Sequence, residues 1–331
     1  MIESPNHLNQ RRSSILLWFG VTLLFVLADS PLRAERVAIF DFDDRLEEEN
    51  TVAHYIEKRL KNADPRIDVR QHSGKGNEAR SIEVLRNLDG AGYDLIITIT
   101  TDALILARHI LTRTPVLYTN VNNPLSLGFE SLEAPGGNIS GASYYVPIEK
   151  QLALYQKIQP QMRTIGLIFD RYNKSRKVEL PEARNACSRL GIRPEIEIME
   201  KNADLVPLIR RLLDAGVDAV IATSSDKVYN HIGEFVGICT NAGVPVYSFN
   251  KGGVNLGAVA ALASDYFEMV DRLLIPMAIR VLHDNVNPGS LPPAFLQQNR
   301  VYLNARQIEK LRLQVPPDIF QNAVWLNNRM E

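Results

Sequence analysis

The chain has 331 residues, which is more than one hydrophobic core usually serves, so its length favours two folded lobes. Hydrophobic residues make up 45%, charged residues 23%, and the formal net charge is -1. This balance excludes a strongly basic nucleic-acid binder and a protein with a long acidic tail.

Residues 1–34 are predicted to be a secretory signal peptide. An arginine pair, Arg11-Arg12, precedes an uncharged, mostly apolar run at 15–28, which is short for a membrane span. The residues Leu-Arg-Ala at 32–34 then offer a cleavage site before Glu35. Because a leucine stands where a small residue is preferred, an uncleaved membrane anchor remains an alternative. No cysteine follows the apolar run, which excludes a lipoprotein anchor.

From residue 35 onward, short apolar strands alternate with amphipathic helices. In the first half we predict strands at 36–42, 67–71, 94–98 and 115–119, and helices at 48–61, 77–88 and 102–111. The helices carry apolar residues at helical spacing, as Val52, Ile56 and Leu60 do. This alternation predicts right-handed βαβ units and a doubly wound parallel sheet.

The second half repeats the order after a connecting segment at 136–145. Helices are predicted at 149–158, 181–190, 205–215 and 228–242, and strands at 164–169, 195–198, 219–222 and 246–249. No residue-level repeat relates the halves. The predicted fold class is α/β, with two similar doubly wound parallel-sheet lobes joined by a hinge.

The last elements follow the second lobe. A polar turn at 250–253 leads to a strand at 258–262 and a helix at 266–282, and a Pro-rich link at 287–293 precedes a strand at 301–303. These elements follow a second lobe that is already complete, so they must pack elsewhere, and the simplest arrangement takes the chain back across the hinge. We therefore predict a first lobe of 35–145 plus about 266–290, and a second of 146–265 plus about 295–331.

The two cysteines, Cys187 and Cys239, each lie in a predicted helix of the second half. Those helices are expected on opposite faces of one sheet, so no disulfide is predicted.

No motif in the chain favours catalysis. It contains no GxxxxGK[ST] loop, no GxSxG elbow and no GxGxxG fingerprint. The histidines are scattered, and none forms HExxH or pairs with a cysteine at zinc spacing. We therefore predict no cofactor, no metal and no enzymatic activity. An enzyme would need a base or nucleophile in the cleft, where only aspartate and tyrosine candidates exist.

Polar residues follow the predicted strands in both halves. They are Asp43, Thr100, Thr101, Asn122, Asn123, Asp170, Tyr172, Ser225, Asp226, Asn250, Asp265 and Tyr266. Because the carboxyl ends of parallel strands face the crevice, two opposed lobes would present both sets to one ligand-binding cleft. Local alternatives exist: Thr101 and Ser225 would serve as helix N-caps and Asp43 as part of a solvated turn. For the set as a whole, the cleft is the better explanation.

Asp265 has two interpretations that the sequence leaves open. At the end of a buried strand, its carboxylate could accept hydrogen bonds from a ligand ammonium or amide, with the Tyr266 ring covering an apolar part of the ligand. Alternatively, Asp265 simply caps the helix that begins there.

The motifs Asn122-Asn123-Pro124, GGNISGAS at 136–143 and GAVAALASDY at 257–266 resemble a known family. It comprises the ABC transporter substrate-binding proteins of the tryptophan- or tyrosine-binding type, and the resemblance covers about 36–323. It implies a fold like that of type I periplasmic binding proteins, and an exported receptor that closes around a small amino-acid-like ligand and delivers it to an ABC permease.

Not every site position matches the family. Thr101, Asp265 and Tyr266 match as they stand, whereas Asn123 and Asp170 stand where the family usually has Asp and Asn. The family's Asp position falls on Ser225 or Asp226. Because these departures fall on the expected pocket, the aromatic amino-acid ligand is not carried over.

A regulator or sensor with the same two lobes is the first rival function, beside the enzyme discussed above. A transcription factor of this shape would need a DNA-binding helix-turn-helix ahead of Glu35, where an apolar leader stands instead. A periplasmic ligand-sensing partner of a membrane signalling protein remains the alternative. In either case we expect a periplasmic monomer that binds a small molecule and no nucleic acid.

Overall fold

The computed structural model describes residues 33–42, 51–124, 133, 135–173, 175–200 and 204–326. Residues 1–32 of the predicted signal peptide, and Asp43, lie outside these residues. Within the described ranges, no helix combines the length and apolar character that a membrane span needs.

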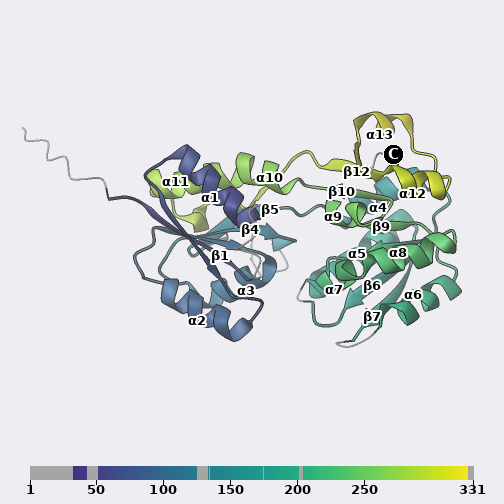
Figure 1. Ribbon diagram of the computed structural model, residues 1–331, viewed down its shortest axis with the longest axis horizontal. Helices are drawn as coiled ribbons and strands as arrows, with labels where there is room; N and C mark the ends of the chain where they lie inside the picture. The colour runs from purple at the N-terminus through teal and green to yellow at the C-terminus, as the bar shows by residue number, and fades with distance from the viewer. Residues whose placement is uncertain are drawn as a thin grey trace, which may run out of the picture. The chain divides into compact units, whose positions relative to one another are not determined.

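The first sheet has six strands, all parallel, in the order β11-β5-β4-β3-β1-β2. Figure 1 labels β1, β4 and β5 of this sheet, in the purple-to-blue part of the chain. They are β1 (Arg36–Asp41), β2 (Asp68–Ser73), β3 (Leu95–Ile99), β4 (Val116–Val121), β5 (Ile139–Ser143) and β11 (Ala294–Phe295). Strand order reverses at β1, which makes the sheet doubly wound.

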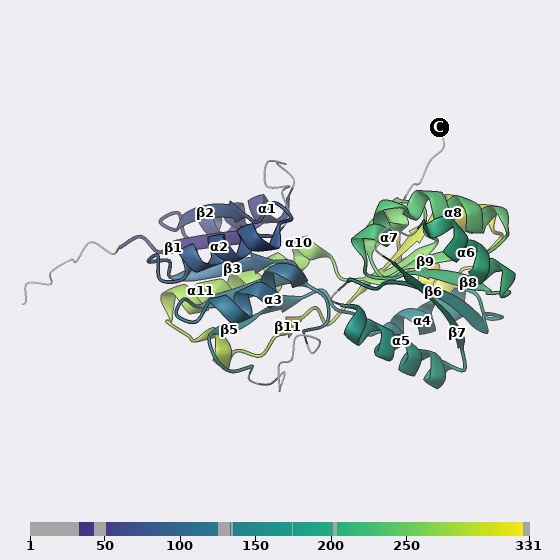
Figure 2. The ribbon, with the colours of Figure 1, turned by 90° about the horizontal axis from the view of Figure 1, so that it is seen from below.

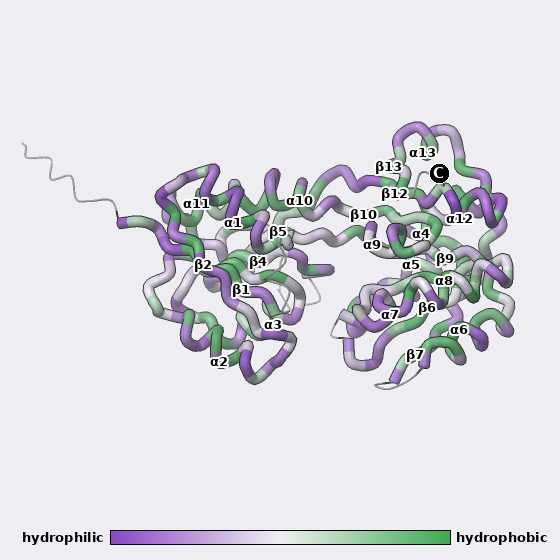
Figure 3. Tube along the Cα trace, viewed as in Figure 1, coloured by the Kyte–Doolittle hydropathy of each residue, from purple (hydrophilic) through white to green (hydrophobic). Residues whose placement is uncertain are grey.

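Helices cover both faces of this sheet because its strands are apolar on both sides. Val37 and Ile39 of β1 share one core with α1 (Val52–Ala63) and α11 (Ile275–His283). Ala38 and Phe40 point to the opposite core, which is closed by α2 (Glu78–Leu88) and α3 (Thr101–Ile110). Figure 3 shows the hydrophobic stretches of the chain in the interior of this layered structure.

The second parallel sheet has the order β7-β6-β8-β9 (Figure 2). Its strands are β6 (Thr164–Asp170), β7 (Arg193–Met199), β8 (Ala219–Ala222) and β9 (Val246–Ser248). Its helices are α4 (Ile148–Ile158), α5 (Arg176–Leu190), α6 (Leu205–Asp214), α7 (Asp226–Asn230) and α8 (Ile232–Asn241). Cys187 and Cys239 are buried, free, and in the cores on opposite faces, as predicted.

A small mixed sheet packs in the same core as the second parallel sheet. It contains β10 (Ala260–Ala263), β12 (Arg300–Asn304) and β13 (Val324–Leu326), and β12 runs antiparallel to β10. Three short helices accompany it: α9 (Lys251–Asn255), α12 (Ala305–Lys310) and α13 (Pro317–Asn322).

One long helical segment follows β10. It consists of α10 (Tyr266–Met269), a π-helical turn η3 (Val270–Leu274) and α11, and a short 3-10 turn η4 (Pro288–Ser290) comes after it. Met269, Val270 and Leu274 pack in the core of the first sheet with Val37 and Ile39. The chain beyond Arg33 groups as a single unit by its contacts, so the predicted lobe boundaries remain a prediction.

The prediction of a connecting segment at 136–145 is wrong, because residues Ile139–Ser143 form the parallel strand β5. The segment is rich in small residues and lacks the long apolar run of its neighbours. Close packing against β4 requires a small residue here: a Cβ on Gly141 would lie 2.2 Å from the carbonyl oxygen of Tyr118. A strand packed this closely carries no strong apolar signal.

Three further local predictions need correction. The turn at 250–253 is the start of α9, because the Asn250 Oδ1 accepts a hydrogen bond from the Gly253 amide at 3.0 Å and caps the helix. The single helix at 228–242 is broken at His231 into α7 and α8. The strand predicted at 258–262 begins at Ala260 and pairs with β12 in the mixed sheet.

Candidate functional site

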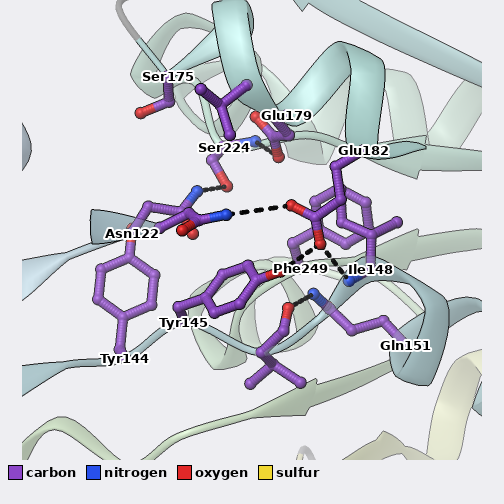
Figure 4. Close-up of a pocket in the computed structure, with 13 residues that line it drawn as sticks. Asn122, Tyr144, Tyr145, Ile148, Gln151, Ser175, Glu179, Glu182, Ser224 and Phe249 are labelled. Carbon is purple, nitrogen blue, oxygen red and sulfur yellow. Dashed lines mark hydrogen bonds between the residues drawn. The ribbon is translucent and has the colours of Figure 1, made fainter. Parts of the chain in front are cut away.

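A small enclosed pocket lies where residues following the strands of both parallel sheets meet (Figure 4). Its room of about 20 Å³ holds roughly one water molecule. The lining residues are Asn122, Asn123, Tyr144, Tyr145, Val146, Ile148, Gln151, Ser175, Val178, Glu179, Glu182, Ser224 and Phe249. A wider open groove of about 940 Å³ runs along α1 between Thr51 and Lys61, but it contains none of the predicted site residues.

Asn122 and Ser224 connect the two sides of the pocket. Asn122 follows β4 of the first sheet, Ser224 follows β8 of the second, and the Asn122 Nδ2 donates a hydrogen bond to the Ser224 Oγ at 3.2 Å. The Asn122 backbone is held by Ser143, whose Oγ donates to the Asn122 carbonyl at 2.5 Å. Asn173 holds the other side by donating to the Ser224 carbonyl at 2.8 Å.

The Glu182 carboxylate of α5 accepts hydrogen bonds from three donors. Its Oε1 accepts from the Tyr145 hydroxyl at 2.5 Å and from the Ile148 amide at 3.0 Å, and its Oε2 lies 3.5 Å from the Asn123 Nδ2 (Figure 4). Burial, together with the bond to the Glu182 carboxylate, raises the pKa of Tyr145 well above its usual range. Tyr145 therefore acts as a neutral hydrogen-bond donor to Glu182.

Glu179 lies one helical turn before Glu182 on the same face of α5. Its side chain is 5% exposed and accepts a hydrogen bond from the Ser224 amide at 3.1 Å. Burial raises the pKa of Glu179 to about 7, a rise to which the nearby Glu182 charge also contributes. The pocket thus holds a carboxyl group that titrates near neutral pH.

Backbone strain collects at the strand ends beside the pocket. Thr100 follows β3 with φ 84°, and Asn120 lies in β4 with φ 53°, both in the region that favours glycine. Such conformations cost of order 1–3 kcal/mol each and persist where the surroundings enforce them. The buried Asn120 Oδ1 and Ser225 Oγ also find no hydrogen-bond partner among the described residues.

Of the predicted site residues, Asn122 and Asn123 line the enclosed pocket. Thr100 caps α3 by accepting from the Ala103 amide, and Asn250 caps α9. Thr101 accepts from the Asn122 amide at 3.4 Å, so it supports the pocket rather than lining it.

The predicted residues after β6 and β8 lie outside the pocket lining. Asp170 is buried, accepts from the Tyr172 amide at 3.0 Å and lies 3.6 Å from the Lys227 Nζ. The Tyr172 ring is 60% exposed. Asp226 begins α7, and its side chain is not among the described ones.

Asp265 has the geometry of a helix cap. Its Oδ1 accepts from the amides of Phe267 and Glu268 at 3.0 and 3.1 Å, while its Oδ2 lies 3.8 Å from the Lys251 Nζ. Tyr266 packs against the pocket-lining Tyr144, with ring centroids 5.1 Å apart. A ligand contact of Asp265 stays a prediction.

Sequence reasoning missed most of the polar pocket lining. The missed residues are Tyr144, Tyr145, Gln151, Ser175, Glu179 and Glu182, whereas Ser224 directly precedes the predicted Ser225 after β8. The helix predicted at 181–190 actually begins at Arg176 and contains Pro181. With the helix start at its true position, the i, i+3 pair of glutamates on one face would have been visible.

A possible metal-ligand cluster lies at the opposite, amino-terminal edge of the first sheet. Glu35, Asp64 and His283 place one ligand atom each within 4.8 Å of one another. The His283 Nε2 is 3.3 Å from both carboxylates, and Arg66 donates to both oxygens of Asp64. These contacts form a complete ion-pair network, and nothing in them points to a metal.

The sequence pattern of the ABC transporter substrate binding protein family matches residues 50–325. The chain belongs to this family. As a family member it is a substrate-binding protein and not an enzyme, in agreement with the sequence prediction.

Known relatives agree with this assignment. The chain is 24% identical over 225 residues to a tyrosine-binding protein of Clostridioides difficile. The matched region covers 67% of this chain and 64% of that relative, which is just under two thirds of the relative's length. An ABC domain in complex with L-Trp from Streptococcus pneumonia matches with a TM-score of 0.76 at 18% identity, covering 88% and 99% of the two chains.

A ligand-free, open substrate-binding protein with adhesive properties from Clostridium difficile also matches, with a TM-score of 0.72 at 19% identity and 89% and 100% coverage. At these identities the solved structures support the fold, and the predicted type I periplasmic-binding-protein class is confirmed.

Proposed function

We propose that this protein is the exported receptor of an ABC importer and binds a small amino-acid-like solute between its two parallel-sheet lobes. The observation that carries the proposal is the pocket bridged by Asn122 and Ser224, to which both sheets contribute residues from the carboxyl ends of their strands. Open α/β sheets bind ligands at such ends. Residues from both sheets could therefore contact one ligand.

The size of the pocket supports hinge closure. Room for about one water molecule is too little for an amino acid. A ligand must therefore part the Asn122–Ser224 and Asn123–Glu182 contacts before it is enclosed. Movement of two lobes about a hinge supplies that opening, and the ligand then stabilises the closed state by its contacts with both sides.

The ligand class follows from the lining and from the relatives. Amide, hydroxyl and carboxylate groups converge beside the rings of Tyr144, Tyr145 and Phe249, an arrangement suited to a small solute with an ammonium group and an apolar part. One relative is a tyrosine-binding protein, and a structural match was solved with L-Trp.

Export and partnership complete the proposal. The arginine pair and apolar run before Glu35 favour secretion into the periplasm, and the family assignment favours delivery to an ABC permease by a monomeric receptor. A ligand-sensing partner of a membrane protein would use the same lobes and the same closure. An uncleaved leader in the exported protein would favour that alternative.

The test is a binding screen of the purified exported chain against L-amino acids and their amine derivatives, by thermal shift and then calorimetry. We expect saturable one-site binding that Asn122→Ala weakens at least tenfold, since it removes an amide group that can bind the ligand once the Asn122–Ser224 contact has parted. Asn322→Ala, at an exposed site in α13, is the matched control and should bind like the parent chain. Failure of a folded protein to bind any of these compounds would contradict the proposal.

A further inference from the structure

The wall that α5 contributes to the pocket carries two carboxylates. Glu179 and Glu182 are spaced i, i+3, and Figure 4 shows both side chains beside the pocket, with Glu179 near Ser224 and Glu182 near Tyr145 and Ile148. Glu182 already receives three donors, and Glu179 accepts a hydrogen bond from the Ser224 amide, with the Ser224 hydroxyl also interacting with its carboxyl group. Glu179 therefore has acceptor capacity left for a ligand.

No side-chain cation balances this pair within the described pocket lining. That lining contains no lysine, arginine or histidine. Two basic groups lie outside this lining: Lys227 is 3.6 Å from Asp170, and Arg189, which is 2.7 Å from Glu149, lines an adjoining open space that also borders Glu182. A ligand carboxylate would meet only neutral donors here, together with repulsion from two glutamates.

Aromatic rings complete the lining. Tyr144, Tyr145 and Phe249 border the same small space as the two glutamates. The face of an aromatic ring attracts a cation, and the attraction grows when water is excluded. Carboxylates combined with aromatic faces, and no opposing side-chain cation, form a site chemically matched to an organic ammonium ion.

We propose that this pocket selects organic amines of net positive charge over the corresponding zwitterionic amino acids, with Glu179 and Glu182 receiving the ammonium group. The proposal rests on the proposed function, because it sharpens the ligand class of that same site. An amine and its parent amino acid share the ammonium and the ring. They differ in one carboxylate, for which the described lining offers no charged partner.

The site also makes amine binding depend on pH. The titratable groups facing Glu179 are Glu182 on α5 and Tyr229 on α7, and neither supplies a positive charge. Because burial raises the pKa of Glu179 to about 7, the carboxylate becomes available between pH 6 and pH 8. Amine affinity should rise over this range.

The experiment compares matched probes by calorimetry at pH 7.5: tyramine with L-tyrosine, and tryptamine with L-tryptophan. In each pair we expect the amine to bind at least tenfold more tightly. Glu179→Gln and Glu182→Gln should each weaken amine binding by about ten- to a hundredfold, the range for a charge-assisted hydrogen bond. Glu234→Gln, an exposed carboxylate of α8, is the matched control and should leave binding unchanged.

Thermal melts of each variant verify that it is folded, and Glu179→Gln should also flatten the pH dependence of amine binding. Tighter binding of the amino acids than of the amines would overturn this inference and leave the proposed function intact. Amine binding that neither glutamine variant weakens would also overturn it. Failure of all four probes to bind the folded parent chain would overturn this inference, whereas the proposed function fails only if the wider screen of L-amino acids and amines also finds no ligand.

Discussion

Replacing Glu179 with glutamine should make the folded protein more stable at neutral and alkaline pH. The carboxyl group is 5% exposed, and its burial raises its pKa from the usual 4.5 to about 7. Folding therefore favours the protonated form. The stability that comes from this preference is complete below pH 4.5 and is lost as pH rises through about 7.

The size of the effect follows from the two pKa values. They differ by about 2.5, and each unit corresponds to ~1.4 kcal/mol, so the ionisation of Glu179 lowers the free energy of unfolding by about 3 kcal/mol between pH 4 and pH 8. Glutamine has nearly the same shape and does not ionise. It can still accept the Ser224 amide hydrogen bond through its carbonyl oxygen.

The assay is urea unfolding of the parent chain and Glu179→Gln at pH 4, 5, 6, 7 and 8. We expect similar stability at pH 4 and an advantage of about 2–3 kcal/mol for the variant at pH 8, since the other titrations cancel in the difference. Glu234→Gln on the exposed face of α8 is the control. A difference that stays constant across this pH range would refute the assigned burial cost.

Further predictions address the cap, the sheet, the motion and the leader. Asp265→Ala should lower the free energy of unfolding by about 1 kcal/mol through loss of the α10 cap; an added loss of affinity of tenfold or more, by calorimetry, would establish a ligand contact as well. Gly141→Ala should destabilise the protein by about 1–3 kcal/mol in urea unfolding, because the new Cβ meets backbone of Tyr118 at 2.2 Å; an unchanged midpoint would contradict that packing. A bound ligand should reduce the radius of gyration in small-angle scattering without changing the circular dichroism, and no change at saturation would argue against closure. Amino-terminal sequencing of the exported form should begin at Glu35; an intact Met1 on a membrane-bound species would favour the anchored sensor.

The doubly wound sheets could be predicted because their strands are apolar on both faces. Runs such as Leu95–Ile99 and Thr164–Asp170, separated by amphipathic helices, leave few alternatives to parallel βαβ packing. β5 could not be found in this way, because it is built from small residues whose role appears only when Tyr118 lies against Gly141. The antiparallel pairing of β10 with β12 depends on a contact between residues about forty positions apart.

The candidate site was predictable only where strand ends define it. Asn122 follows directly from the end of β4, whereas the carboxylates come from the first turns of α5, a helix face that strand-end reasoning does not reach. The local pattern placed the helix start at Pro181, because proline is common in a first turn. In the structure the helix continues through Pro181, and this continuation places Glu179 and Glu182 on one face.

Two opposing electrostatic effects act on the ionisation of Glu179: the helix dipole of α5 and desolvation by burial. Glu179 lies in the first turn of α5, where the helix dipole favours a carboxylate by typically 0.3–1 kcal/mol. Relative to a glutamate with the usual pKa of 4.5, burial opposes the ionisation of Glu179 by about 3 kcal/mol. The desolvation cost is therefore larger than the helix-dipole effect. In the described pocket lining no side-chain cation offsets that cost. A cationic ligand would offset it, and this relief of the ionisation cost of Glu179 would favour binding of a cation over a neutral or anionic ligand.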